Sequence, residues 1–164
     1  MVRLCASTAA ASPQPVPDMA RGVLLALGAA GALAAGLSPA GHASPAQDYT
    51  LYCMGCHGPE AEGVPGKIPA LAVTLTLFMR SPQGRNYLAR VPGAANSALS
   101  DAQLAAVLNW LAARFPPADA PPPAPFTIEE IASVRRIPLA DVKAARRETV
   151  RALAASGAAP PADY

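Results

Sequence analysis

The sequence predicts an all-helical fold, and three observations support that prediction. Aliphatic residues and alanine dominate the 164 residues, while aromatic residues make up only 5%. β-Branched runs are few, and none alternates apolar with polar residues as a strand does. Residues 104–115 instead repeat apolar side chains at helical spacing. The length suggests one domain with extensions, and a formal charge of +2 is too small to indicate a nucleic-acid partner.

The N-terminal segment, residues 1–43, is predicted to be a secretory signal peptide. Residues 23–37, VLLALGAAGALAAGL, are apolar and uncharged, and Arg21 precedes them. Small residues flank His42 in GHA, as signal peptidase requires. The apolar run is shorter than the roughly 20 residues of a membrane span, although an uncleaved segment would anchor the chain in the membrane. We therefore predict export to the periplasm.

The first eighteen residues form a polar lead that is unusual before a signal peptide, so Met19 is a candidate translation start; the alternative is a long n-region. Cleavage after Ala43 would remove Cys5 and His42. The mature chain, in an oxidising compartment, would then keep two cysteines and one histidine. These are Cys53, Cys56 and His57, all within LYCMGCHGPE, residues 51–60.

The Cys-Met-Gly-Cys-His motif allows three interpretations. A structural zinc site normally needs four ligands, and the mature chain offers only these three strong ones. A thioredoxin-type redox pair would require flanking strands, which the sequence does not predict. Covalent haem attachment is what Cys-x-x-Cys-His indicates directly. The motif therefore favours haem c, with the histidine as an iron ligand.

The residues around the motif resemble the class I cytochrome c family. SPAQDYTLYCMGCHG is similar to its first helix and haem-binding turn, and GPEAEGVPGKIPAL, residues 58–71, to the loop beside the haem. The resemblance covers about residues 45–115. It implies one covalent haem c, with thioether bonds to Cys53 and Cys56 and His57 as the proximal iron ligand. It also implies that the carbonyl of Pro69 accepts a hydrogen bond from that histidine.

Residues 70–90 are predicted to contain a helix near 70–80, a turn at 81–84 and a short helix near 85–90. This region contains three arginines, whose guanidinium groups suit haem propionates or a solvated surface. They are Arg80, Arg85 and Arg90.

The stretch VPGAANSALSDAQLAAVLNWLAARF resembles the C-terminal helix of the family. Ser100 and Gln103 form a capping box at its start. Trp110 is assigned to packing, with a haem propionate as the alternative partner of its indole N–H. One face of the helix is apolar, and its members are Leu104, Val107, Leu108, Leu111 and Phe115.

The expected distal methionine is missing, because the family's Met-Pro dipeptide is replaced here by Val91-Pro92. Met79 is the candidate distal ligand, and its alternative role is core packing. Met54 lies inside the haem-binding turn, and Lys67 is a less suitable ligand. An open sixth position would allow binding of small ligands. No distal acid–base pair is evident, which disfavours peroxidase-like catalysis.

The C-terminal tail begins with a stiff proline-rich linker, residues 116–126. In the helical extension over residues 127–164, Thr127 and Glu130 form a second capping box. A helix is predicted from Leu139 to Ala155, with a narrow apolar stripe beside cationic residues that include Arg146. Two short helices cannot bury a core alone, so the tail should dock on the haem domain, residues 44–115, or on a partner.

Together these patterns predict an exported monohaem c-type cytochrome, an electron-transfer protein rather than an enzyme. It would pass single electrons between redox proteins of the periplasm or membrane. The partner would be a periplasmic dehydrogenase or respiratory-chain component. One alternative is a non-catalytic subunit of a larger dehydrogenase, and another is a haem-based binder or sensor of small ligands.

Overall fold

The computed structural model describes residues 43–118 and 120–157 of the chain. Within these ranges the only β-structure is an isolated bridge between Val64 and Ile68, so the prediction of an all-helical fold is confirmed. No helix in the described part of the chain has the length and apolarity needed to span a membrane. Apart from Ala43, the predicted signal segment lies outside the described residues.

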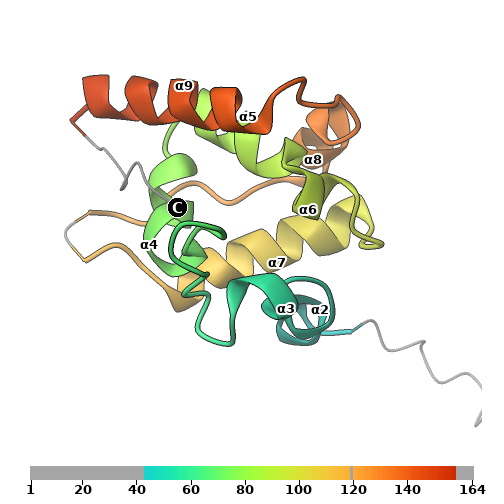
Figure 1. Cartoon of the computed structure of the whole chain (residues 1–164). Coiled ribbons are helices and arrows are strands. Elements are labelled where there is room, and N and C mark those ends of the chain that lie inside the picture. The colour runs from blue at the N-terminus through green and yellow to red at the C-terminus, as the bar shows by residue number, and fades with distance from the viewer. Residues whose placement is uncertain (1–42, 119, 158–164) are drawn as a thin grey trace, which may run out of the picture. The chain divides into compact units, whose positions relative to one another are not determined.

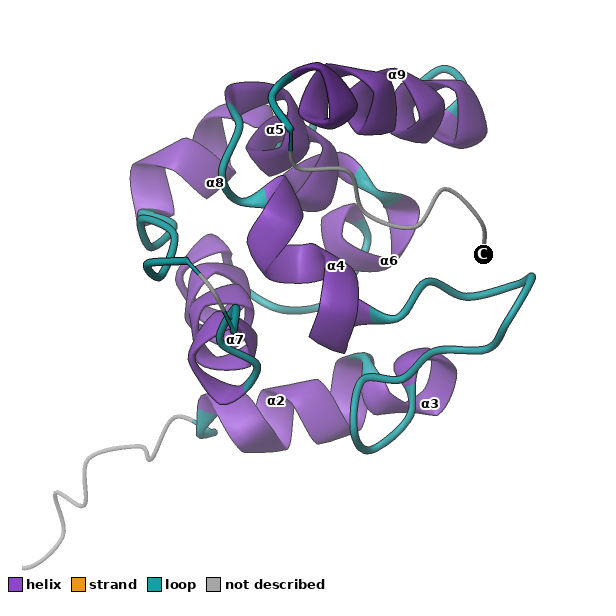
Figure 2. Cartoon of the chain, turned by 90° about the vertical axis from the view of Figure 1, so that its left-hand side faces the viewer, coloured by secondary structure: helices purple, strands orange, loops and turns teal. Residues whose placement is uncertain are grey.

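The helices follow one another along the chain with short connections, except for the loop before α4 and the linker before α8 (Figure 1). Figures 1 and 2 place α3 near the lower end and α9 at the upper end, with α4 between them. Their bounds are α2 Pro45–Tyr52, α3 Met54–His57, α4 Leu71–Phe78, α5 Pro82–Arg90, α6 Pro92–Ala95, α7 Asp101–Arg114, α8 Ile128–Val134 and α9 Val142–Ala155.

Helices α2 and α7 pack against each other through polar and aromatic contacts. The capping box predicted at Ser100 and Gln103 is present at the start of α7. The Gln103 side chain also donates to the buried carboxylate of Asp48 on α2, at 3.2 Å. The Trp110 ring lies 5.6 Å from the ring of Tyr49, between centroids. Trp110 therefore contributes to the packing of α2 on α7.

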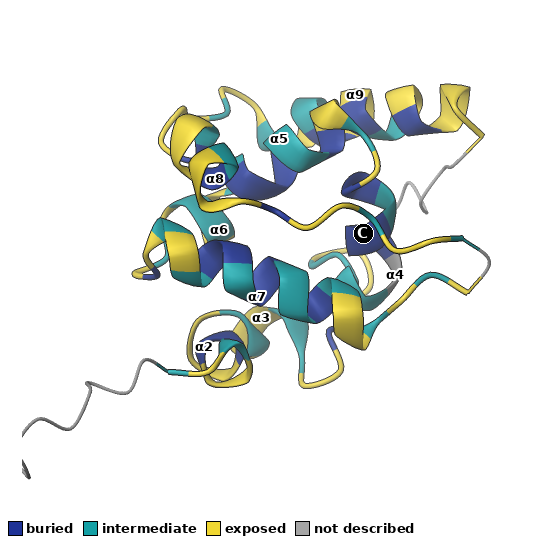
Figure 3. Cartoon of the chain, turned by 180° about the vertical axis from the view of Figure 1, so that it is seen from behind, coloured by how far each residue is buried: buried dark blue, intermediate teal, exposed yellow. Residues whose placement is uncertain are grey.

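Helix α7 is central to the core. Figure 3 shows buried positions recurring along the length of α7. The apolar face predicted for this helix is confirmed, because four of its five members are buried and Phe115 at the end is half-buried. The buried members are Leu104, Val107, Leu108 and Leu111.

Helix α5 begins earlier than the sequence predicted. The turn expected over 81–84 is instead the helix start, with Ser81 as the N-cap that accepts a hydrogen bond from the Gly84 N–H at 3.0 Å. Pro82 occupies the first helical position, where its missing N–H and fixed φ angle are tolerated. Proline and glycine are also common in turns, so these residues suggested a turn. They fit a helix start here because Ser81 caps the helix.

Gly84 is required by the close approach of α5 to the end of α4. A Cβ atom at this position would lie 2.1 Å from the carbonyl oxygen of Phe78. We therefore expect Gly84→Ala to lower the free energy of unfolding by about 2 to 3 kcal/mol, because backbone would have to move. Urea denaturation measures this change. Gly55→Ala, which meets nothing within 4 Å, is the matched control, and equal effects would contradict the prediction.

The C-terminal tail docks on the rest of the described chain. Helix α8 packs on α7 and α5, and α9 packs on α5 and α4. Arg135, directly after α8, is only 4% exposed and contacts Asp101 at 3.0 Å. Its other hydrogen bonds go to the end of α6 and the segment after it, at the carbonyls of Ala94, Ala95, Ser97 and Leu99 and the hydroxyl of Ser97.

Three arginines that the sequence analysis considered as partners of haem propionates bind the C-terminal tail. Arg80 donates to the carbonyl of Pro121 at 2.8 Å, and Arg90 donates to the carbonyls of residues 137 and 138. Arg85 pairs with Glu130 and donates to the carbonyls of residues 124 and 125. The capping box predicted at Thr127 is therefore only half formed: Thr127 accepts from the Glu130 N–H, while the Glu130 carboxylate is held by Arg85.

Two carboxylates in these contacts should make the fold sensitive to acid. Hydrogen bonds from Arg136 and Arg135 lower the pKa of Asp101 below its ordinary 3.8, and a hydrogen bond from Arg85 lowers the pKa of Glu130 below 4.5. Because the pKa values of both carboxyl groups are lowered in the folded state, the ionised carboxylates stabilise the fold at pH values above their ordinary pKa values. This stabilisation is lost as the pH falls through the folded-state values.

We therefore expect the free energy of unfolding to decrease as the pH falls below about 4.5. Urea denaturation at a series of pH values measures this decrease. Glu130→Gln should be less stable than the native chain at neutral pH and should lose less stability on acidification. A free energy that does not change between about pH 5 and about pH 3 would contradict the assignment.

Candidate functional site

A cavity of about 340 Å³ brings the sequence motif together with the helical core. Cys53, Cys56 and His57 line it at the α3 end, and Val142 and Arg146 of α9 also line it. Large aliphatic and aromatic side chains make up much of the remaining wall, as expected for a site that takes an apolar cofactor. They include Leu71, Leu75, Phe78, Leu88, Leu104, Leu108 and Leu111.

The motif is held by the junction of two helices. Cys53 ends α2, where its N–H donates to the Tyr49 carbonyl at 2.9 Å, and the single turn of α3 follows. Gly58 leaves that turn with a φ of 78°, which glycine adopts readily. The Tyr49 hydroxyl donates to the Gly58 carbonyl at 2.6 Å, and burial raises the pKa of Tyr49 to about 12. Tyr49 thus stays protonated and fixes the end of the motif.

The loop between α3 and α4 places a carbonyl beside His57. The Nδ1 atom of His57 lies 3.0 Å from the carbonyl oxygen of Pro69, the contact that the resemblance implied. Because a carbonyl can only accept, Nδ1 carries the proton and Nε2 keeps its lone pair. Burial lowers the pKa of His57, with the Pro69 contact opposing it, so the imidazole is neutral near pH 7. A neutral imidazole with an accessible Nε2 lone pair is chemically able to bind a metal ion.

The turn at Gly63 brings the loop back toward the motif. Its N–H donates to the His57 carbonyl at 2.8 Å, and its φ angle is 68°. A Cβ atom there would lie 2.4 Å from the carbonyl oxygen of Ile68, so the close approach requires glycine. The bridge between Val64 and Ile68 closes the turn that leads to Pro69.

The two thiols differ in environment. Cys53 is half-buried and Cys56 is exposed. Burial is the main cause that raises the pKa of Cys53, with Asp48 and Cys56 contributing. A raised pKa reduces the thiolate population that a redox-active cysteine needs. Together with the absence of extended strands from the described residues, this environment argues against a thioredoxin-type pair.

A structural zinc site has no support among the described residues. No group of three or more histidine, cysteine, aspartate or glutamate side chains there is arranged to hold a metal ion. The residues present suit a cofactor that brings its own metal and in-plane ligands. A metalloporphyrin needs only axial donors from the chain, and a neutral imidazole is a donor of that kind.

The residues considered for the distal position differ in whether they line the cavity. Met79 is 2% exposed and belongs to the buried core, outside the residues that line the cavity. This placement favours packing as its role. Val91, which replaces the expected methionine, does line the cavity, and so does Lys67.

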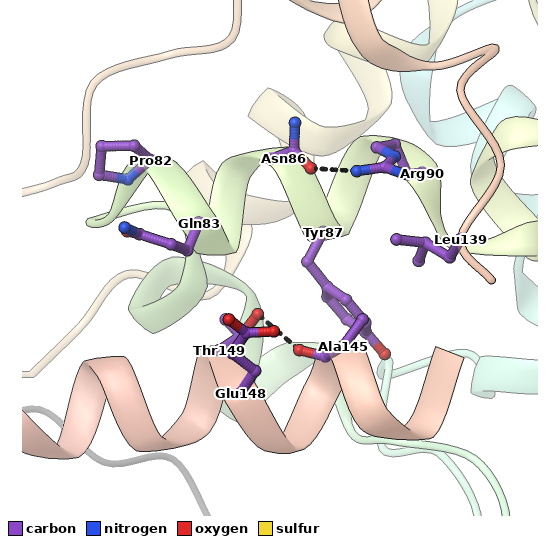
Figure 4. A pocket seen from close by; sticks show the side chains of 9 residues that line it. All are labelled: Pro82, Gln83, Asn86, Tyr87, Arg90, Leu139, Ala145, Glu148 and Thr149. Carbon is purple, nitrogen blue, oxygen red and sulfur yellow. Dashed lines mark hydrogen bonds between the residues drawn. The ribbon is translucent and has the colours of Figure 1, made fainter. Parts of the chain in front are cut away.

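The sequence interpretation missed Arg146, which is 5% exposed and lines the cavity from α9. A signal was present, because Arg146 lies four residues after Val142 and four before Val150 on the apolar stripe of this helix. In Figure 4, Tyr87 points from α5 toward α9, across a second cavity of about 440 Å³ between these helices. Tyr87 lines the first cavity as well.

The arrangement thus offers two thiols, one neutral imidazole and an apolar cavity in one place. Thiols can be alkylated by a cofactor's side groups, the imidazole can bind its metal, and the cavity can cover its apolar face. Cys56 is exposed, so this end of the cavity reaches the protein surface. No protein-family model, no curated protein and no solved structure matches the chain.

Proposed function

We propose that this protein is an exported monohaem c-type cytochrome that transfers single electrons. The observation that carries the proposal is the cavity lined by Cys53, Cys56 and His57. The contact of His57 Nδ1 with the Pro69 carbonyl supports it, because it leaves Nε2 free to bind iron. The packing of α7 on α2 fits a class I cytochrome c arrangement.

The residues fit one haem c. Cys53 and Cys56 would form thioether bonds to the haem, and His57 would bind its iron. When bound, the haem supplies a one-electron couple; the chain holds the imidazole through Pro69 and excludes water with leucine and phenylalanine side chains. Because Cys53 is half-buried and Cys56 is exposed, the attachment edge would lie partly at the surface, where a partner protein can approach.

The role is that of an electron carrier rather than an enzyme. The cavity lining contains no aspartate or glutamate and no second histidine among the described residues, so no distal acid–base pair supports peroxidase-like chemistry. The signal peptide predicted over residues 1–43 is the basis for proposing a periplasmic location. A periplasmic dehydrogenase or respiratory-chain protein is the partner class that such a carrier serves, either as a separate acceptor or as an assembly that includes this chain.

A second candidate is a haem-based binder or sensor of small ligands. It is favoured by the placement of Met79 outside the cavity lining while Val91 lies within it. Valine cannot bind iron, so the sixth position would be open or weakly held. Polarity and access around that position would then decide which ligands bind.

One experiment tests the function and separates the two candidates. The chain is expressed in a periplasm together with a cytochrome c maturation system, and absorption spectra are recorded oxidised, reduced and reduced with CO. A c-type haem spectrum is expected. A low-spin spectrum indifferent to CO supports the electron carrier, and a high-spin spectrum that shifts with CO supports the ligand binder. A purified chain without haem contradicts both.

Met79→Ala provides a matched test of the distal ligand. If Met79 only packs in the core, the variant should keep the spectrum and CO response of the unchanged protein, with a loss of stability of about 2 to 5 kcal/mol. Leu153→Ala, a fully buried core residue that also lies outside the cavity lining, is the control for the stability loss. A change from low spin to high spin in Met79→Ala alone would assign the methionine to iron.

A further inference from the structure

The C-terminal extension contributes a charged side chain to the cavity. Arg146 lies on α9, far from His57 in the sequence, yet both residues line the same cavity. Arg146 is 5% exposed, so its guanidinium group is largely shielded from bulk water. The guanidinium group of arginine keeps its positive charge in proteins. The cavity wall therefore has a fixed positive charge.

The position of the guanidinium is defined by an aromatic ring. Its carbon Cζ lies 5.2 Å from the centroid of the Phe78 ring, and Phe78 is itself buried and lines the cavity. The negative face of the ring attracts the cation and restricts where it can move. The hydrocarbon stem of Arg146 continues the apolar stripe of α9.

The charge of the cavity wall has one sign. Its charged lining residues are Lys67 and Arg146, the imidazole of His57 is neutral, and none of the described lining residues carries a carboxylate side chain. Four arginines that do not line this cavity bind backbone carbonyls, Glu130 or Asp101; they are Arg80, Arg85, Arg90 and Arg135. A cationic wall of this kind is complementary to an anionic oxygen group inside the cavity.

We propose that Arg146 holds an anionic group in this cavity and so couples the C-terminal extension to the bound cofactor. The inference rests on the proposed function. Two sources share this chemistry: a carboxylate of the haem itself, and a small anion such as azide that enters the cavity. A guanidinium suits both, because it donates several hydrogen bonds from a planar group.

The test uses the haem-loaded full chain. Arg146→Met keeps the length and apolar stem but removes the charge, and Arg146→Lys restores the charge. Arg147→Met, at an exposed position on the same helix, is the matched control. The readouts are the equilibrium constant for reduction against a mediator, its dependence on pH, and the dissociation constant of azide.

If the group is a haem carboxylate, Arg146→Met should lower the reduction equilibrium constant about ten-fold, because a nearby cation favours the reduced haem. The pH dependence should move to higher pH, since the carboxylate loses its cationic partner, and azide affinity should not change. If the group is an exogenous anion, the azide dissociation constant should rise about ten-fold. Arg146→Lys should recover part of either effect.

Three results overturn the inference in distinguishable ways. A haem-loaded Arg146→Met that matches Arg147→Met in every readout removes this role and leaves the proposed function intact. An effect that Arg146→Lys does not rescue assigns Arg146 to packing alone. A native chain that attaches no haem removes both the proposed function and the inference.

Discussion

Replacing both Cys53 and Cys56 with alanine is expected to abolish covalent attachment of haem to the chain. These residues are the only described cysteines, and both line the cavity beside His57. Each single variant should retain at most one thioether bond, with a correspondingly shifted reduced spectrum. Mass spectrometry of the denatured protein and haem staining after denaturing electrophoresis measure the attachment directly.

Met54→Leu is the matched control for this prediction. Met54 lies between the two cysteines but does not line the cavity, and leucine keeps its apolar volume. It should retain covalent haem. Attachment that persists in the double cysteine variant would show that another residue forms the bond. Loss in Met54→Leu would show that the turn is sensitive to any change.

Replacing Arg135 with methionine is expected to lower the free energy of unfolding by about 3 to 5 kcal/mol. Its guanidinium is nearly fully buried and contacts Asp101, while its remaining N–H groups satisfy carbonyls between α6 and α7. Removing it leaves those acceptors without their donor in a place that water reaches poorly. Urea denaturation measures the loss.

Arg136→Met is the matched control, because Arg136 contacts the other oxygen of the same carboxylate at 3.0 Å but is 71% exposed. An exposed pair of this kind contributes less than about 1 kcal/mol. Similar losses in the two variants would contradict the assignment of Arg135 as the buried anchor of α8. Circular dichroism before denaturation checks that the helical content is retained.

The helices were predictable because their signals are local. The apolar face and capping box of α7 follow from neighbouring residues, and the structure has both. The start of α5 was missed, because Pro82 and Gly84 also suit a turn and only the Ser81 cap decides between them. Only half of the capping box predicted at Thr127 is formed. The local pattern assigns the Glu130 carboxylate to the helix end, but this carboxylate binds Arg85, which is distant in the sequence.

The site was predictable where it lies in one short segment. Cys53, Cys56 and His57 are adjacent in sequence, and they line one cavity in the structure. The roles of arginines depend on which helices meet, and a single sequence does not give that. Arg85 and Arg90 therefore bind the tail, while Arg146, which looked like one cation among several on a helix, enters the cavity.

The arginines that hold the tail bind mainly to main-chain oxygens, and this has a consequence for how the sequence can diverge. Substitutions at the acceptor positions leave the carbonyl groups in place, so the linker and the segment after α6 can change composition without losing these contacts. The donors have no such freedom, because only arginine offers several N–H groups in one plane. Amino-acid substitutions should therefore accumulate slowly at Arg85, Arg90 and Arg135. They should accumulate faster at acceptor positions such as Pro121 and Ala124.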